Sequence, residues 1–247
     1  MAQPATNIRY HMPVGQALGL GFKAAFKNLI PFTAMALVIY VPWVAALLAT
    51  PKLDPEQSGS AGFLLLLLMF LLPALLNFIV TGAVTFGVVQ HLRGKRAGFG
   101  ECMARGFTNL PRILGTSLLV GIRVFLFFLL LIVPGYIEIC RLSVAVPVAI
   151  VERAGPGKAV ARSIDLTRGS RGSVFAIIIV IGIVNYVLGI VVPLALKDMG
   201  PTAILVGTVA VALWSAVWTA CSGAVSYFLL RKGKENLDLE ELAQVFA

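Results

Sequence analysis

The sequence has few charged residues and few of the side chains that carry chemistry. Only 13% of its 247 residues are charged, whereas about a quarter are charged in a typical soluble domain. It has two histidines and three cysteines, Cys102, Cys140 and Cys221, which are far apart and form no CxxC pair. No metal site is therefore expected, and we interpret the cysteines as small buried apolar side chains. At 59% apolar residues, the chain has too little polar surface to cover a soluble domain of this size.

Catalytic signatures are also missing from the sequence. There is no HExxH motif, no GxSxG motif and no phosphate-binding GxxxxGK[ST] loop, and only eleven residues are acidic. Metal-assisted chemistry on phosphate esters needs carboxylates and histidines that converge on one site. We therefore expect neither enzymatic activity nor a cofactor.

Long apolar segments make up most of the chain instead. Hydrocarbon about 30 Å thick requires about 20 helical residues. Six segments reach or approach that length: 29–49, 62–90, 113–133, 136–151, 174–195 and 202–230. We predict an all-α fold, a polytopic membrane helical bundle of about six transmembrane helices. Residues 1–234 would form one integral membrane domain and residues 235–247 a cytoplasmic acidic tail.

The basic residues alternate between the two sides of these segments. Most of the 20 lysines and arginines lie before the first segment, in the loops 91–112 and 152–173, or directly after the last segment. The opposite loops contain only Lys52 and Lys197. This bias predicts that both termini are cytoplasmic. The net charge of +9 then indicates anionic membrane lipids as partners rather than nucleic acid.

Three shorter segments have the pattern of amphipathic helices that lie at the membrane interface. They cover residues 13–28, 98–111 and 156–168. Gly15, Gly100 and Gly157 align without gaps, and each segment leads into a pair of apolar segments. A three-fold repeat of an interfacial helix plus a hairpin is one interpretation. The alternative is that glycine-rich membrane sequences align by chance.

Polar residues within the apolar segments form a candidate intramembrane polar site of Arg123, Glu138, Arg141 and Asn185. A charged residue inside a span is a functional hypothesis by default. A Pro134–Gly135 turn would leave Glu138 near the outer surface, where it reaches Arg141 easily but Arg123 only with strain. Two interpretations remain open for this site: a binding site for an anionic lipid or solute, and a structural polar clamp.

Small residues form a row in the last apolar segment, at Ala212, Ala216, Ala220 and Ala224. Rows of this kind let helices approach closely. The row is expected to pack within the monomer, and a homo-oligomer seam is the alternative.

The stretch 134–169 carries a further pattern of residues. It reads Pro134, Gly135, Arg141, Pro147, Glu152, Ala159, Arg162, Ser163, Leu166, Thr167 and Gly169. This resembles the YciC-like uncharacterised bacterial inner-membrane proteins and the membrane domain attached to some glycerophosphodiester phosphodiesterases. The resemblance implies membrane residence and a role near lipid or envelope homeostasis. It does not imply phosphodiesterase activity, which belongs to a separate soluble domain in the fused proteins.

Within this pattern we expect Glu152 to form an ion pair with Arg162. We also expect Ser163 and Thr167 to form hydrogen bonds with the backbone at the bend. This would make the stretch a structural elbow, whereas the alternative is a headgroup-binding site that uses Arg162 and Arg168. For the whole chain, the sequence favours a non-enzymatic protein of lipid or envelope homeostasis. The alternative is a transporter, flippase or channel for an anionic lipid or small solute.

Overall fold

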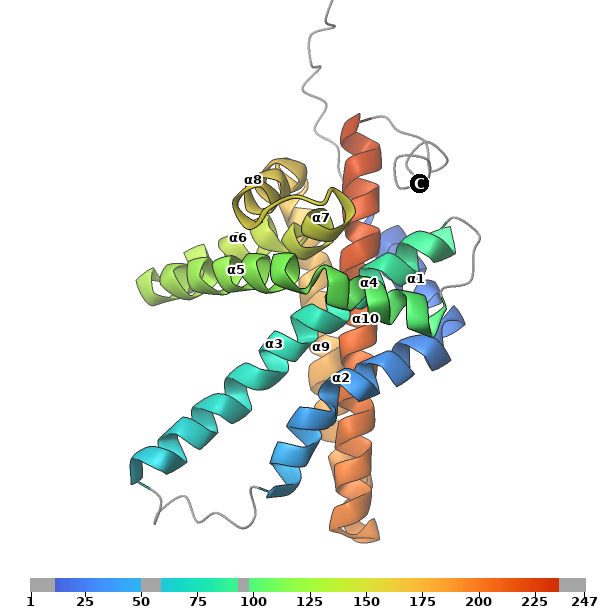
Figure 1. The fold of residues 1–247 in the computed structure, drawn as a ribbon, viewed down its shortest axis with the longest axis vertical. Coiled ribbons are helices and arrows are strands. Elements are labelled where there is room, and N and C mark those ends of the chain that lie inside the picture. The colour runs from blue at the N-terminus through green and yellow to red at the C-terminus, as the bar shows by residue number, and fades with distance from the viewer. Residues whose placement is uncertain (1–11, 50–58, 93–97, 236–247) are drawn as a thin grey trace, which may run out of the picture.

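The computed structural model describes residues 12–49, 59–92 and 98–235, and every regular element in these ranges is helical (Figure 1). The order is α1 (Val14–Lys27), α2 (Leu29–Ala49), α3 (Gly59–Leu92), α4 (Phe99–Thr108), α5 (Leu110–Leu130), α6 (Ile132–Leu142), α7 (Ala145–Val151), α8 (Pro156–Thr167), α9 (Arg171–Ala195), the short 3-10 helix η2 (Lys197–Met199) and α10 (Pro201–Glu235). The prediction of an all-α fold is therefore confirmed for the described residues.

The helix boundaries follow the predicted segments closely. The three amphipathic segments are α1, α4 and α8, and the six apolar segments are α2, α3, α5, the α6–α7 pair, α9 and α10. One short helix followed by a pair of apolar helical segments thus occurs three times in the element order. Gly15, Gly100 and Gly157 are each the second residue of their helix.

Four helical segments are long and apolar enough to cross a membrane: Leu110–Leu130, Ile132–Val151, Arg171–Ala195 and Pro201–Glu235. The second of these combines α6 and α7. The α1–α2 pair would be a fifth if it formed one span, but it bends by 82° at Asn28. In α3 the described apolar stretch is the shorter Leu76–Gln90. By length and composition, the described residues therefore support four to five of the six predicted spans.

Much of the apolar surface of these helices is not covered by protein. In the most apolar windows of α5 and α9, only 17% of the residues are buried. Leu129 of α5 is 74% exposed and Ile183 of α9 is 58% exposed. Exposed apolar surface of this extent is compatible with contact with lipid.

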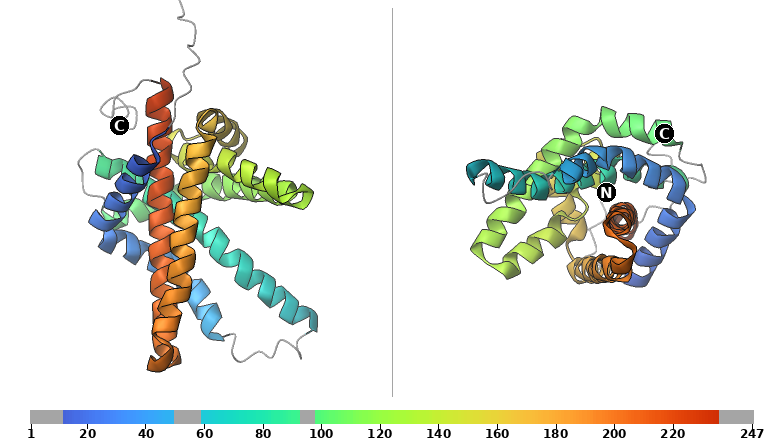
Figure 2. Two further views of the ribbon diagram at one scale, coloured as in Figure 1. Left: turned by 180° about the vertical axis from the view of Figure 1, so that it is seen from behind. Right: turned by 90° about the horizontal axis from the view of Figure 1, so that it is seen from below.

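The helices converge at one end and diverge at the other. Figures 1 and 2 show α9 and α10 side by side along the long axis, while the α5–α6 hairpin extends across them. The helices α2 and α3 slant away from α10 toward their far ends. The shared core lies where the three groups meet, and it includes Phe32, Val84 and Tyr227, each 0% exposed. The structure is therefore a splayed arrangement of hairpins rather than a parallel bundle.

The alanine row of α10 lies in this core. Ala216, Ala220 and Ala224 are at most 1% exposed, so the chain itself covers three of the four positions. Helix α1 packs on the same helix so tightly that a Cβ atom on Gly21 would lie 2.7 Å from Oγ of Ser222. The close approach that small residues permit is therefore used within the monomer.

Candidate functional site

The turn between α5 and α6 is shorter than the sequence predicted. It consists of Leu131 alone, which is extended at φ −167° and ψ 152°, and Pro134 and Gly135 lie in the first turn of α6. The predicted Pro134–Gly135 turn is therefore wrong. A proline suits the first helical turn because the N–H that it lacks would have no partner there. Gly135 instead permits close packing, since a Cβ atom would lie 2.5 Å from the ring of Phe128.

The position of this turn brings the buried charges together. Arg123 lies eight residues before Leu131 and Glu138 seven residues after it, so both lie at the same level of the hairpin. Nη2 of Arg123 is 2.7 Å from Oε1 of Glu138, and Nη1 of Arg141 donates to Oε2 at 2.9 Å. The expectation that Arg123 would reach Glu138 only with strain is therefore wrong. It assumed that the turn lay at Pro134–Gly135, whereas the turn lies at Leu131.

This ion cluster is asymmetric in exposure and in charge. The side chain of Glu138 is 0% exposed, whereas those of Arg123 and Arg141 are 33% and 26% exposed. One carboxylate therefore holds two guanidinium groups and leaves a net positive charge on the hairpin. Asn185, the fourth residue of the predicted site, makes no hydrogen bond through its buried Oδ1 to any described residue. The structure thus assembles three of the four residues.

The fourth apolar segment is broken between α6 and α7. Helix α6 ends at Leu142, Ser143 and Val144 form a turn, and Pro147 lies in the first turn of α7. The carbonyl of Arg141, at the broken end, accepts hydrogen bonds from Ser163 Oγ at 2.8 Å and from Thr167 Oγ1 at 3.4 Å. These two hydroxyls thus satisfy a backbone group that the break would leave without a helical partner. We call residues 141–169, which contain this break, α7 and α8, the elbow.

The far side of the elbow is held by a second polar network. Oε1 of Glu152 accepts hydrogen bonds from Arg162 Nε at 3.3 Å and from the Tyr227 hydroxyl at 3.0 Å. Arg162 also pairs with Glu235, which accepts from Arg231 Nε at 2.6 Å. The expected Glu152–Arg162 pair is present. Because its charge is shared among carboxylates, Arg162 is less suited to a lipid headgroup than to joining α8 to α10.

Three members of this network were not among the residues selected from the sequence. Tyr227, Arg231 and Glu235 follow one another at four-residue intervals, so they lie on one face of α10. This four-residue spacing could have indicated from the sequence that the three side chains share a face of α10. It would not have identified Glu152 as their partner. Glu235, which was assigned to the tail, is the last residue of α10. Residues 236–247 of the tail lie outside the described residues.

Four other cations around the elbow make neither an ion pair nor a side-chain hydrogen bond with any described residue, unlike Lys234, which donates to the carbonyl of Asp165. They are Arg153, Lys158, Arg168 and Arg171, and all four are exposed. Arg153 lies two residues after the end of α7 and is in the left-handed conformation, at φ 49°, and Gly169 follows α8 at φ 94°. Glycine adopts this conformation without a Cβ penalty, which explains Gly169. The described carboxylates at the elbow therefore pair with Arg162, and they do not neutralise these four cations.

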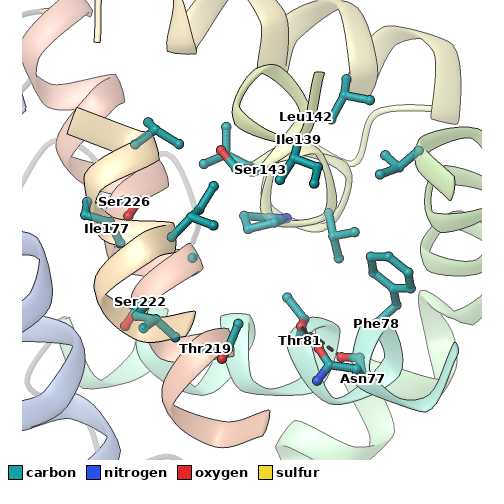
Figure 3. A pocket seen from close by; sticks show the side chains of 18 of the residues that line it. Asn77, Phe78, Thr81, Ile139, Leu142, Ser143, Ile177, Thr219, Ser222 and Ser226 are labelled. Atoms are coloured by element: carbon teal, nitrogen blue, oxygen red, sulfur yellow. Dashed lines mark hydrogen bonds between the residues drawn. The ribbon is translucent and has the colours of Figure 1, made fainter. Parts of the chain in front are cut away.

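A cavity of about 340 Å³ lies where the three groups of helices meet (Figure 3). Its walls come from α3, α5, α6, α7, α9 and α10 and are mostly apolar. Several small polar side chains line it: Asn77, Thr81, Ser143, Thr219, Ser222 and Ser226. The broken segment contributes Ser143 and Pro147 to the wall.

The described residues contain no group of three His, Cys, Asp or Glu side chains that could hold a metal ion. Fold and site together define a helical protein with long, uncovered apolar helices and a cationic elbow at the end where the helices converge. No family model, no curated protein and no solved structure matches the chain. The likeness to the YciC-like proteins is therefore a resemblance in sequence pattern.

Proposed function

We propose that this chain is an integral protein of the bacterial inner membrane whose cytoplasmic face binds anionic lipids. In this proposal it acts without catalysis, in lipid or envelope homeostasis, as the YciC-like pattern at 134–169 suggests. Four long apolar helical segments and the exposed surface of α5 and α9 support membrane residence. The proposal includes six crossings and a three-fold repeat, for which the element order and the positions of Gly15, Gly100 and Gly157 are the support.

The observation that carries the lipid proposal is the set of four exposed cations at the elbow that have no partner among the described residues, Arg153, Lys158, Arg168 and Arg171. Cations beside a span attract anionic headgroups with about 1 kcal/mol each near the membrane surface. The acidic side chains nearby are already occupied, since Glu152 and Glu235 pair with Arg162. The elbow therefore presents positive charge that the described part of the chain does not neutralise.

Six crossings add α2 and α3 to the four long apolar segments. In the structure the α5–α6 hairpin lies across α9 and α10, and its tip at Leu131 is 66% exposed. This exposed apolar tip supports contact of the hairpin with lipid.

The lipid proposal is tested on the full chain, purified in detergent and freed of lipid. Phosphatidylglycerol and phosphatidylcholine with identical acyl chains are offered together, and native mass spectrometry counts the bound molecules. We expect several-fold higher occupancy by phosphatidylglycerol. A variant with all four cations changed to glutamine should lose this preference, whereas Lys197→Gln at the opposite end of α9 should keep it. Equal occupancy by both lipids in the unaltered chain would refute the proposal.

The orientation is tested by labelling single cysteines in intact cells. Lys158→Cys should react only after the cytoplasm is opened, and Met199→Cys, which replaces a 70% exposed residue, should react from outside. The three natural cysteines are buried, so they should contribute little background. Labelling of both positions from the same side would contradict an odd number of crossings between them.

A second candidate function is transport of an anionic lipid or small solute. The cavity lined by hydroxyl side chains beside the α6–α7 break favours it, because transporters place their sites at broken helices between repeats. Gly223 lines this cavity, and a Cβ atom there would have open space around it. Gly223→Leu should therefore fill the cavity and abolish dithionite-detected flipping of fluorescent phosphatidylglycerol in proteoliposomes. Absence of flipping by the unaltered chain would eliminate this candidate as a flippase.

A further inference from the structure

A second hollow lies on the outside of the molecule, between α6 and the start of α9. It encloses about 390 Å³, and its surface is apolar throughout. Arg171, the first residue of α9, contributes only the apolar part of its side chain to this surface. Val133, Ile137 and Cys140 line it along one face of α6. Seven residues of helix separate the first of these from the last, which gives the groove a length of about 10 Å.

The two walls of the groove are in register. The ring of Tyr136 on α6 meets the ring of Phe175 on α9 edge to face, with 6.3 Å between centroids. Arg171 lies one helical turn before Phe175, and Cys140 lies one turn beyond Tyr136. The cation and Cys140 therefore belong to the end of the groove next to the elbow, and Val133 belongs to the end next to the hairpin tip.

The walls are open to the surroundings rather than closed over. Val133 is 69% exposed, Ile137 47% and Phe175 42%. The described residues place no carboxylate on Arg171 and none in the first turn of α9. Arg168, which is exposed and has no partner in the described part of the chain, lies three residues earlier, at the end of α8. An occupant that is complementary to this groove has a long apolar body and an anionic group at one end.

We infer that the groove between α6 and α9 binds one anionic phospholipid, with an acyl chain along Val133, Ile137 and Phe175 and the phosphate at Arg171. This rests on the proposed lipid-binding function and locates it at one site. A phospholipid satisfies both requirements of the groove, because its phosphate is covalently joined to its apolar chains. A free anion would leave the apolar walls uncovered, and a neutral lipid would leave the cation without a partner.

The site differs from the headgroup site considered from the sequence, which used Arg162 and Arg168. Arg162 is taken up by Glu152 and Glu235, whereas Arg171 is exposed at the rim of the groove and has no carboxylate partner among the described residues. In this proposal Arg171, at the start of α9, therefore binds the lipid headgroup in place of Arg162, in the middle of α8.

The test uses the full chain with the same pair of lipids, phosphatidylglycerol and phosphatidylcholine, measured by native mass spectrometry. Arg171→Gln should lower the occupancy of the tightest phosphatidylglycerol site about fivefold, as expected for loss of one cation near a headgroup. Arg171→Lys should retain most of that occupancy. The matched control is Lys27→Gln, which removes an exposed cation from the last turn of α1, outside the elbow, and should leave this site unchanged.

The apolar half of the site is tested separately with Ile137→Trp. This substitution fills the groove from an exposed position and leaves the core intact, so it should lower retention of both lipids at this site. Equal losses from Arg171→Gln and Lys27→Gln would overturn the inference, because they would show a diffuse charge effect. Unchanged occupancy in Ile137→Trp would also overturn it. The unaltered chain could prefer phosphatidylglycerol while neither Arg171→Gln nor Ile137→Trp changes its occupancy. That result would refute lipid binding at this groove and leave the general lipid proposal standing.

Discussion

The buried carboxylate of Glu138 gives the most direct test of the structure. The substitution Glu138→Gln keeps the size of the side chain and removes the charge that holds Arg123 at 2.7 Å and Arg141 at 2.9 Å. Two guanidinium groups would then face an apolar hairpin with no counter-charge. We expect the free energy of unfolding to fall and the α5–α6 hairpin to loosen.

The size of this effect follows from burial. Removal of one partner from a fully buried ion pair costs about 3–5 kcal/mol. Glu138 is 0% exposed, but the two arginines are 33% and 26% exposed, so they can recover part of their solvation. We therefore expect a loss of about 2–3 kcal/mol. For a chain of this length, that loss corresponds to a decrease in Tm of about 5–10 °C.

The measurement is thermal unfolding of the detergent-solubilised chain, with Asp165→Asn as the control. Asp165 is 62% exposed and lies 3.8 Å from Arg162, so its loss should cost less than about 0.5 kcal/mol. A double-mutant cycle with Arg123→Gln should show a coupling of about 1 kcal/mol or more. A Glu138→Gln variant as stable as the unaltered chain, or a cycle without coupling, would refute the ion cluster.

Three further predictions concern packing, thiol chemistry and the elbow. Gly135→Leu should lower stability by about 1–3 kcal/mol in the same unfolding assay, because its Cβ atom would meet the ring of Phe128 at 2.5 Å; a neutral result would contradict the tight hairpin. Burial raises the pKa of the Cys102 thiol to about 11. Maleimide at pH 7.5 should therefore label it about a hundredfold more slowly than in the SDS-unfolded chain, and equal rates would show that it is not buried. Ser163→Ala should cost about 1 kcal/mol through the carbonyl of Arg141, and hydrogen exchange near the break should then increase; unchanged protection would exclude the contact.

Features that depend on local sequence were predictable from the chain alone. Apolar length located the long helices, and amphipathic spacing located α1, α4 and α8 nearly to the residue. The Glu152–Arg162 pair was also predictable, because only a short turn and part of α8 separate the two residues. In each case neighbouring residues determine the outcome, so periodicity and turn chemistry carry the necessary information.

Features that depend on exact turn positions or distant contacts were not predictable in this way. The Pro134–Gly135 pair looks like a turn, but proline is equally suited to the first turn of a helix. A shift of the turn to Leu131 changed which charges meet. The contact of Glu152 with Tyr227 joins residues 75 apart, and no local pattern indicates it. The angle between hairpins follows from contacts at their shared end, which spacing along one helix does not encode.

The polar contacts form a continuous path through the elbow, and Arg141 is the residue that connects its two halves. Its guanidinium binds the carboxylate of Glu138, which also holds Arg123 of α5, while its carbonyl is held by Ser163 and Thr167 of α8.

Helix α8 is in turn fixed to α7 and α10, because Arg162 binds both Glu152 and Glu235. In a protein whose helices are apolar on most sides, apolar contact alone distinguishes poorly between helix partners and lipid. Hydrogen bonds and ion pairs have defined directions, so this path determines how the second hairpin meets the third. The same path holds the end of α8 next to the start of α9, and therefore helps to position Arg171 at the groove between α6 and α9.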